Sequence, residues 1–168
     1  YLKELVNDKT NTKILINEKN CGAGFSRNNG IVCAKGEFIA FLDADDFWLP
    51  NKLEHQINLI KKYKLDFIHG SYSIINDYDS FVGKFISKTI NYNQLIKSCD
   101  VGTSTVLVKS ELIKKHLFKN ISTKEDYVCW LSIIKDTKIL FGDNKEVTMY
   151  RDKKSSLSGG IVLKFINA

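Results

Sequence analysis

An apolar run that ends in three carboxylates restricts the fold of this chain more than any other feature. Residues 38–42 are Phe-Ile-Ala-Phe-Leu, with no polar alternation, and Asp43, Asp45 and Asp46 follow directly. Such a run predicts a strand that is covered on both faces, as in a parallel sheet flanked by helices. Open α/β sheets bind their ligands at the carboxyl ends of these strands. The three acids are therefore expected at a binding edge.

The closeness of the three carboxylates predicts a cation among them. Neighbouring acids repel one another unless a positive group lies between them. Mg²⁺ and Mn²⁺ prefer oxygen ligands and commonly bind together with a phosphate-bearing substrate. The alternative is a solvated acidic turn in which Asp46 caps the following helix.

The acidic turn also has one feature of a calcium-binding loop. Glu54 stands eleven residues after Asp43, at the spacing of the last ligand of an EF-hand. The sixth position of that loop should be glycine, but here it is Trp48, and Pro50 lies inside the loop. The segment before the turn indicates a strand, whereas an EF-hand has a helix there. These differences argue against a calcium sensor.

Length and cysteine usage bound the class of protein. The chain has 168 residues, enough for one well-filled core and too few for two ordinary domains. No apolar run approaches the length of a membrane-spanning helix, and no signal peptide is visible. The cysteines are far apart, without the paired spacing of zinc ligands, and are expected to be reduced thiols of a cytosolic protein: Cys21, Cys33, Cys99 and Cys129.

The charge balance is basic but scattered. The formal net charge is +6, from 25 basic and 19 acidic residues. This excess suits phosphorylated ligands and is compatible with peripheral contact with an anionic membrane. Arg27 and Arg151 are the two arginines, and no basic stripe alternates with aromatic residues. Nucleic acid is therefore not an expected partner.

Alternating strand and helix patterns predict an α/β sandwich around a mostly parallel sheet. Strands are expected at 13–17, 37–42, 67–75, 78–88, 103–109, 138–142 and 147–151. Helices are expected at 1–9, 26–34, 50–63, 91–98, 110–115 and 122–135. Ser26 is the expected N-cap of its helix. In the helix at 50–63, Leu53, Ile57 and Ile60 share the face that should pack on the core.

A glycine-containing turn, residues 22–27, precedes one of these helices. A dinucleotide fingerprint would place its third glycine at position 27, where this chain has Arg27, so that motif is not present. The N–H groups of the turn and of the helix N-terminus could still face a phosphate, with Arg27 beside them. The alternative is a tight turn followed by a surface arginine.

Glu125 and Asp126 form a second candidate site. Ser122 and Glu125 have the Ser-x-x-Glu spacing of a capping box, so helix capping is the favoured role for Glu125. Asp126 shares a helical stripe with Trp130 and Ile133, which predicts that it points inward. Burial would raise the pKa of its carboxyl toward the range of a general base. The alternative is an aspartate paired with a lysine at the rim.

Histidine gives no comparable signal. His55 is expected at the surface, His116 at a helix end, and His69 as a hydrogen-bonded core residue of a strand. None of them forms a Cys/His or Ser/His/Asp arrangement that would indicate a metal site or a nucleophile.

Taken together, these segments resemble family 2 glycosyltransferases of the GT-A fold. The specific part of the resemblance is an ordered block, and looser matches follow it; the segments are 20–24, 26–31, 34–46, 48–54, then 102–105, 125–130 and 150–151. The resemblance implies a Rossmann-like GT-A domain over residues 1–151 and leaves 152–168 as a polar C-terminal tail. The family's first strand and its base-binding turn have no counterpart here. We therefore expect a partial domain that lacks its first strand or strands and, alone, binds donor weakly.

The resemblance also implies roles for individual residues. Asp43-Ala44-Asp45 matches the family's DxD motif, in which Asp43 lies near the nucleotide ribose and Asp45 binds Mg²⁺ or Mn²⁺, with Asp43 also in the metal's ligand set. Arg27 would lie at the nucleotide end of the donor, and Asp126 matches the catalytic base. The expected supporting residues are Asp46 beside the metal and Glu125 and Trp130 near the acceptor.

The expected function is that of a metal-dependent, inverting glycosyltransferase. It would move a sugar from a nucleotide-diphosphate sugar, with a UDP-sugar as the commonest choice, to a hydroxyl of a glycan or lipid-linked acceptor. Surface polysaccharide or lipooligosaccharide synthesis, in the cytoplasm at the inner face of the membrane, is the expected setting. The alternative is a non-catalytic remnant or nucleotide- and metal-binding module. The enzyme hypothesis requires Asp126 to face the same hollow as Asp43 and Asp45.

Overall fold

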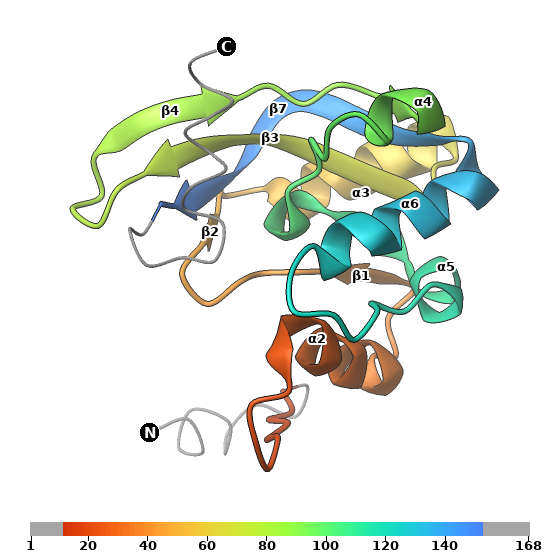
Figure 1. Ribbon diagram of the computed structural model, residues 1–168. Coiled ribbons are helices and arrows are strands. Elements are labelled where there is room, and N and C mark those ends of the chain that lie inside the picture. Colours follow the sequence, from red (N-terminus) through yellow and green to blue (C-terminus); the bar gives the residue numbers. More distant parts are fainter. Residues whose placement is uncertain (1–11, 153–168) are drawn as a thin grey trace.

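Helices cover both faces of a single sheet in the computed structural model, which describes residues 12–152 (Figure 1). The helices are α2 (Gly22–Cys33), α3 (Lys52–Tyr63), α4 (Tyr92–Leu95), α5 (Ser110–Lys115) and α6 (Glu125–Thr137), with a 3-10 turn, η1, at Thr103–Thr105. The strands are β1 (Phe38–Ala40), β2 (Phe47–Trp48), β3 (Phe67–Ile75), β4 (Phe81–Phe85), β5 (Ile90–Asn91), β6 (Leu107–Lys109) and β7 (Ile139–Arg151). The predicted helix at 1–9 and the tail beyond residue 152 lie outside the described residues.

The sheet is mixed, which corrects the expectation of a mostly parallel one. Its order is β1-β6-β3-β7-β2, with β4 paired to β3 and β5 paired to β7. Between the strands of residues 12–152, β3–β7 is the parallel pairing, and the others are antiparallel. The difference arises because β6 lies between β1 and β3 and runs against both. The strands β1, β3 and β7 still share one direction, and the α/β class with flanking helices is confirmed.

Two apolar clusters in the described part of the chain lie on opposite faces of the sheet. Phe67 and Val108 belong to the larger cluster, which includes residues of α2, α5 and α6. Their neighbours Ile68 and Leu107 belong to the smaller one, beneath α3. Successive residues of a strand point to opposite faces, so strands buried on both sides need continuous apolar runs. The sequence shows this pattern at residues 67–68 of β3 and 107–108 of β6, whereas β3 continues with buried His69, Ser71 and Ser73.

Several predicted element boundaries are wrong. Residues 13–17 form no strand. Helix α2 begins at Gly22, so Ser26 lies inside it, where its Oγ donates to the Gly22 carbonyl at 3.0 Å. Gly22 has φ +82°, and its N–H donates to Asn20 Oδ1 at 3.0 Å, which fixes the earlier start. The two predicted late strands form one continuous strand, β7, whose pairing with β3 shifts in register near Gly70.

Helix α3 presents a different face to the core than its apolar spacing predicted. Leu53 is 43% exposed, whereas Lys52, Gln56 and Ile60 are the buried residues of the helix. Ile57 and Ile60 do contact the smaller cluster. The helix is therefore rotated so that a lysine and a glutamine face inward.

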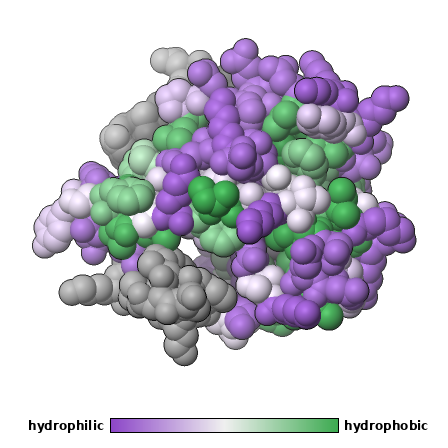
Figure 2. All heavy atoms as spheres, turned by 90° about the horizontal axis from the view of Figure 1, so that it is seen from above, coloured by the Kyte–Doolittle hydropathy of each residue, from purple (hydrophilic) through white to green (hydrophobic). Residues whose placement is uncertain are grey.

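The surface carries apolar side chains in several separate groups among hydrophilic ones, as one face shows (Figure 2). None of the helices in the described part of the chain is long and apolar enough to cross a bilayer. The four cysteines are unpaired, in agreement with the prediction of free thiols.

Candidate active site

The acidic turn that follows β1 is tied to distant parts of the chain. Asp46 is 8% exposed: its Oδ2 accepts a hydrogen bond from Ser104 Oγ at 2.6 Å, and its Oδ1 accepts one from the Arg151 N–H at 3.2 Å. Burial raises the pKa of Asp46 to about 6. Asp46 does not cap α3, whose N-cap is Asn51, so the alternative of a solvated turn is wrong.

Arg27 projects from α2 and bridges two acids that are far apart in the sequence. Its Nη2 donates to both carboxylate oxygens of Asp43, at 2.7 and 3.0 Å, and its Nη1 donates to Glu125 Oε1 at 2.7 Å. The guanidinium also lies over the ring of Phe118, 5.5 Å from its centroid. Arg27 is therefore not the surface arginine of the alternative interpretation. A planar guanidinium suits this task, because its fork of donors can serve two carboxylates at once.

Glu125 does not form the predicted capping box. Helix α6 begins at Glu125 itself, and its N-cap, Lys124, has a left-handed conformation and makes no side-chain capping bond. The carboxylate instead pairs with Arg27, 98 residues away. A Cβ at Gly24 would lie 3.0 Å from Cγ of Glu125, so the missing side chain of Gly24 allows α2 to approach this turn.

Asp126 points inward, as its helical stripe predicted. Its Oδ2 accepts from Thr103 Oγ1 at 3.1 Å, and its Oδ1 accepts from the N–H of Tyr127 at 2.7 Å. Burial raises the pKa of this carboxyl, while the two hydrogen bonds oppose the rise. Its side-chain partner is a hydroxyl, and not the rim lysine of the alternative. A partly desolvated carboxylate of this kind is suited to accept a proton.

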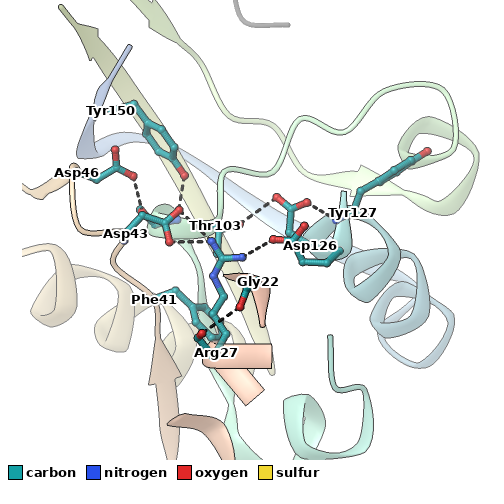
Figure 3. A network of polar contacts seen from close by, with 12 residues as sticks. Gly22, Arg27, Phe41, Asp43, Asp46, Thr103, Asp126, Tyr127 and Tyr150 are labelled. Atoms are coloured by element: carbon teal, nitrogen blue, oxygen red, sulfur yellow. Dashed lines mark hydrogen bonds and ion pairs between the residues drawn. The ribbon is translucent and has the colours of Figure 1, made fainter. Parts of the chain in front are cut away.

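The turn η1 connects the two groups of acids (Figure 3). Thr103 donates to Asp126, and the next residue, Ser104, donates to Asp46 and accepts from the backbone N–H of Asp43 at 3.1 Å. The acidic turn and Asp126 are thus held by consecutive residues. The bonds at η1 and the bridge at Arg27 bring the turn after β1, the middle of α2 and the first turn of α6 to one place.

Tyr150 supports η1 and was missed by the sequence analysis. Its Oη accepts a hydrogen bond from the N–H of Ser104 at 2.9 Å. A Cβ at Gly102 would lie 2.7 Å from this oxygen, so the glycine leaves room for the phenol. Residues 102–105 and 150 belong to segments that resemble the family only loosely. No spacing rule links positions nearly fifty residues apart. The contact was therefore visible only in the folded chain.

Trp130 lies in the core and not at the surface of the site. It is 0% exposed and packs against the rings of Phe41, Phe67 and Phe118, with centroid distances of 6.2, 5.3 and 5.7 Å. Because its side chain is fully buried, it could support an acceptor site only from behind. Its contribution to the site is to fix the position of α6 from behind.

The carboxylates form no closed metal cage. Across residues 12–152, no group of three or more His, Cys, Asp or Glu side chains is placed to hold a metal ion. Asp43 is engaged by Arg27, Asp46 faces inward, and Asp45 is half-buried in the same turn. Mg²⁺ is commonly bound by one or two carboxylates together with substrate phosphates. The turn fits such an open site, in which the diphosphate completes the ligand set.

Comparison with known proteins identifies relatives over most of the chain. The profile of the family described as Glycosyl transferase family 2 matches residues 1–121. The UDP-Glc:alpha-D-GlcNAc-diphosphoundecaprenol beta-1,3-glucosyltransferase WfgD of Escherichia coli is 46% identical over 128 residues, which are 76% of this chain and 50% of that protein. The putative teichuronic acid biosynthesis glycosyltransferase TuaG of Bacillus subtilis is 32% identical, over 84% of this chain and 57% of that protein. The chain thus spans about half the length of these relatives.

Solved structures show the same fold at lower identity. Residues 1–349 of TarS from S. aureus, in complex with UDP-GlcNAc, superpose with a TM-score of 0.67 at 19% identity. The match covers 92% of this chain and 46% of that one. This likeness supports the GT-A-like arrangement of sheet and helices that the sequence predicted.

Proposed function

The chain belongs to glycosyl transferase family 2, and on that premise we propose that it transfers a sugar from a nucleotide-diphosphate sugar to an acceptor hydroxyl. One observation carries the proposal: Arg27 and η1 hold the acidic turn after β1 and the partly buried Asp126 in a single network. A group that binds the leaving diphosphate and a group that accepts a proton are the two requirements of this reaction.

The relatives support a substrate class. The name of WfgD gives UDP-glucose as donor and a GlcNAc-diphosphoundecaprenol as acceptor, and TarS was solved with UDP-GlcNAc. We infer a UDP-sugar donor and a lipid-linked or glycan acceptor for this chain, in the synthesis of a surface polysaccharide. A place in the cytoplasm at the inner face of the membrane, with peripheral membrane contact, follows from such an acceptor and is part of the proposal.

The acidic turn is the proposed donor site. Asp45, together with Asp43, would hold Mg²⁺ or Mn²⁺ against the diphosphate, with Asp43 toward the ribose and Arg27 at the nucleotide end. Such a cation, when bound, offsets the charge that builds on the departing diphosphate. In the structure Asp43 is bonded to Arg27, so donor binding has to share or replace that contact. Asp46 keeps the turn in place through Ser104 and the backbone of Arg151.

Asp126 is the proposed base. The acceptor oxygen attacks C1 of the sugar while its proton passes to the carboxylate of Asp126, and the bond between C1 and the diphosphate oxygen breaks. Attack from the side opposite the leaving group inverts the anomeric centre. The pKa of Asp126 is raised by burial, which makes the carboxylate a stronger proton acceptor than an exposed aspartate.

A thermal-shift titration with UDP and Mn²⁺ tests the donor site. We expect the melting temperature of the wild type to rise with ligand, because a ligand that binds the native state stabilises it. The rise should be lost in Asp45→Asn and kept in Asp77→Asn, a matched change at an exposed position of the β3–β4 turn. If Asp45→Asn keeps the full shift, the donor site is not in the acidic turn, and if UDP with Mn²⁺ gives no shift in the wild type either, the alternative of a non-catalytic remnant is favoured. A shift without any sugar transfer in the intact protein would favour the alternative of a non-catalytic binding module.

A further inference from the structure

Lys52 is buried among neutral groups behind the candidate site. It is 2% exposed, on the inward face of α3. Its Nζ donates to Gln56 Oε1 at 2.8 Å and lies 4.7 Å from the centroid of the Trp48 ring. Within residues 12–152, the recorded partners of this ammonium are thus an amide oxygen and an aromatic face, and not a carboxylate.

This placement does not favour the stability of the fold. A buried charge without an ionic partner costs free energy, and replacing it with an apolar side chain of similar shape is often neutral or stabilising. Burial accordingly lowers the pKa of Lys52 to about 7. A methionine at this position would fill the same space without that cost. The lysine therefore needs an explanation other than packing.

The ammonium determines which way the amide of Gln56 points. A lysine ammonium has donors and no acceptor, so it can face only the oxygen end of that amide. The nitrogen end must then point the other way, where Nε2 donates to the carbonyl of Thr105 at 2.9 Å. Gln56 is itself fully buried, so the amide has no water with which to exchange partners. Lys52 thereby fixes a hydrogen bond to the last residue of η1.

Trp48 holds the same turn from the same side. Its Nε1 donates to the carbonyl of Ser104 at 3.0 Å and to that of Phe41 at 3.2 Å. The ammonium of Lys52 lies over its ring. The carbonyl groups of η1 are thus held from the α3 side, while the hydroxyls of Thr103 and Ser104 reach Asp126 and Asp46.

We propose that Lys52 is a positioning residue, which acts through Gln56 and Trp48 to fix η1 so that Thr103 and Ser104 hold Asp126 and the acidic turn in place. Its effect on sugar transfer rests on the proposed function. Its effect on the order of η1 does not, and it is measured without substrate.

Hydrogen exchange in the variant Lys52→Met tests the effect on η1. The amides of Thr105 and Val106 close the turn by donating to the carbonyls of Gly102 and Thr103, at 3.0 and 3.1 Å. We expect both amides to exchange at least tenfold faster in this variant, while the melting temperature stays equal or rises. Lys61→Met, on the exposed side of the same helix, is the matched control and should change neither quantity.

Gln56→Glu provides a second test that does not depend on Lys52→Met folding. A glutamate would pair with the Lys52 ammonium more strongly than the amide does, but an ionised carboxylate cannot donate to Thr105. The change keeps the pairing with Lys52 and removes the bond to Thr105, so it shows whether that bond orders η1. The proposal predicts faster exchange at Thr105 and Val106 in spite of the stronger pairing.

Each result of these exchange experiments either supports the proposal or overturns it. Faster exchange confined to η1 in Lys52→Met supports the proposal, and in the intact protein it should accompany at least a tenfold fall in kcat. Unchanged exchange at η1 in Lys52→Met, or in Gln56→Glu, would overturn it. Equal acceleration throughout the chain, with a lower melting temperature, would overturn it as well, because Lys52 would then only stabilise the fold. Failure of UDP to bind leaves these results unaffected and bears only on the proposed function.

Discussion

The first turn of α6 and the remainder of the helix are held in different ways. In the first turn, Glu125 pairs with Arg27 and Asp126 accepts from Thr103, partners 98 and 23 residues away. In the following turns the core contacts are mainly apolar, and the buried residues are Cys129, Trp130, Ile133 and Ile134. One helix thus joins a polar site to an aromatic core.

The difference separates what α6 does for stability from what it does for the site. Apolar packing depends on volume and tolerates changes that preserve it. The polar first turn depends on particular partners, since a buried carboxylate that loses its donor costs free energy. The two acids also lie at the helix N-terminus, where the helix dipole favours negative charge. The apolar turns of α6 can therefore fix the position of Asp126, while the polar contacts of its first turn adjust the pKa of its carboxyl.

Loss of the carboxylate of Asp126 should give the largest effect of all. We expect Asp126→Asn to lower the rate of sugar transfer by about 10²–10⁴-fold, the usual scale for a general base, with little change in melting temperature. Steady-state kinetics and thermal unfolding of the intact protein measure the two quantities. Asp136→Asn, an exposed aspartate at the other end of the same helix, is the control. Equal loss in both variants would show that Asp126 has no special role.

Removal of the Trp130 ring should act on the other region of the helix. We expect Trp130→Ala to destabilise the fold by about 3–5 kcal/mol, because a fully buried ring leaves a cavity. Urea unfolding measures this change. The indole N–H has no hydrogen-bond partner among residues 12–152, so Trp130→Phe should cost much less. A Trp130→Ala protein of normal stability that has lost acceptor binding would contradict the core assignment and place the residue at the acceptor.

Breaking the Arg27–Glu125 pair should have a smaller effect, on both the stability of the fold and the rate of sugar transfer. Glu125→Gln keeps the shape of the side chain but removes its charge, and it leaves Arg27 with Asp43 as its remaining anionic partner. We expect a loss of about 1–2 kcal/mol in stability, as for a partly buried charged hydrogen bond, and a fall in kcat. Glu111→Gln, an exposed acid in the first turn of α5, is the control. An unchanged kcat in Glu125→Gln would mean that the bridge does not position Asp126.

Lowering the pH should destabilise the apolar region through His69. The loss of stability per pH unit is the smallest of the effects expected here. His69 is buried beside Phe67, and burial lowers its pKa to about 4 from an ordinary 6.5. The unfolded chain therefore binds more protons between these values, and stability is lost as the pH falls from 6.5 toward 4, by about 1 kcal/mol per unit. Asp46, whose pKa is raised to about 6, acts in the opposite direction in part of this range.

A comparison of pH profiles isolates the contribution of His69. The free energy of unfolding should depend less steeply on pH in His69→Asn than in the wild type between pH 6.5 and 4. Asn can keep the bond that Ser87 makes with the ring nitrogen Nδ1, at 2.9 Å. Parallel profiles for the two proteins would show that His69 is not the neutral core residue described above.

Much of the fold followed from local patterns. The strand at Phe67–Ile75 and the helix at Ser110–Lys115 have the bounds that the sequence predicted. Both begin and end near clear local signals: apolar pairs stand at the two ends of the strand, and Ser110 begins the helix. The predictions that were wrong share one cause, because they depend on contacts that the local pattern of apolar residues does not show. Gly22 and Asn20 move the start of α2, and β6 enters the sheet against its neighbours.

The partners of the site residues could not be predicted in the same way. The motif selected Arg27, Asp43 and Asp126, and their roles stay predictions. The spacing of Ser122 and Glu125 suggested a local cap, whereas the carboxylate bonds across 98 residues. Periodicity likewise placed Leu53 on the core face of α3, where the structure buries Lys52 instead, because such patterns assume that charged residues face water. A residue that positions a site breaks this assumption.

The most direct test of the account is whether a metal at the acidic turn is close to Asp126. Paramagnetic broadening of amide signals by Mn²⁺, added with UDP to the labelled protein, reports this proximity. The account predicts strong broadening at Asp45, Ser104 and Asp126, and clearly weaker broadening at Lys135, in the last turn of the same helix. Broadening of Asp45 and Ser104 with sharp signals from Asp126 would contradict it, because the donor site and the proposed base would then not share one place.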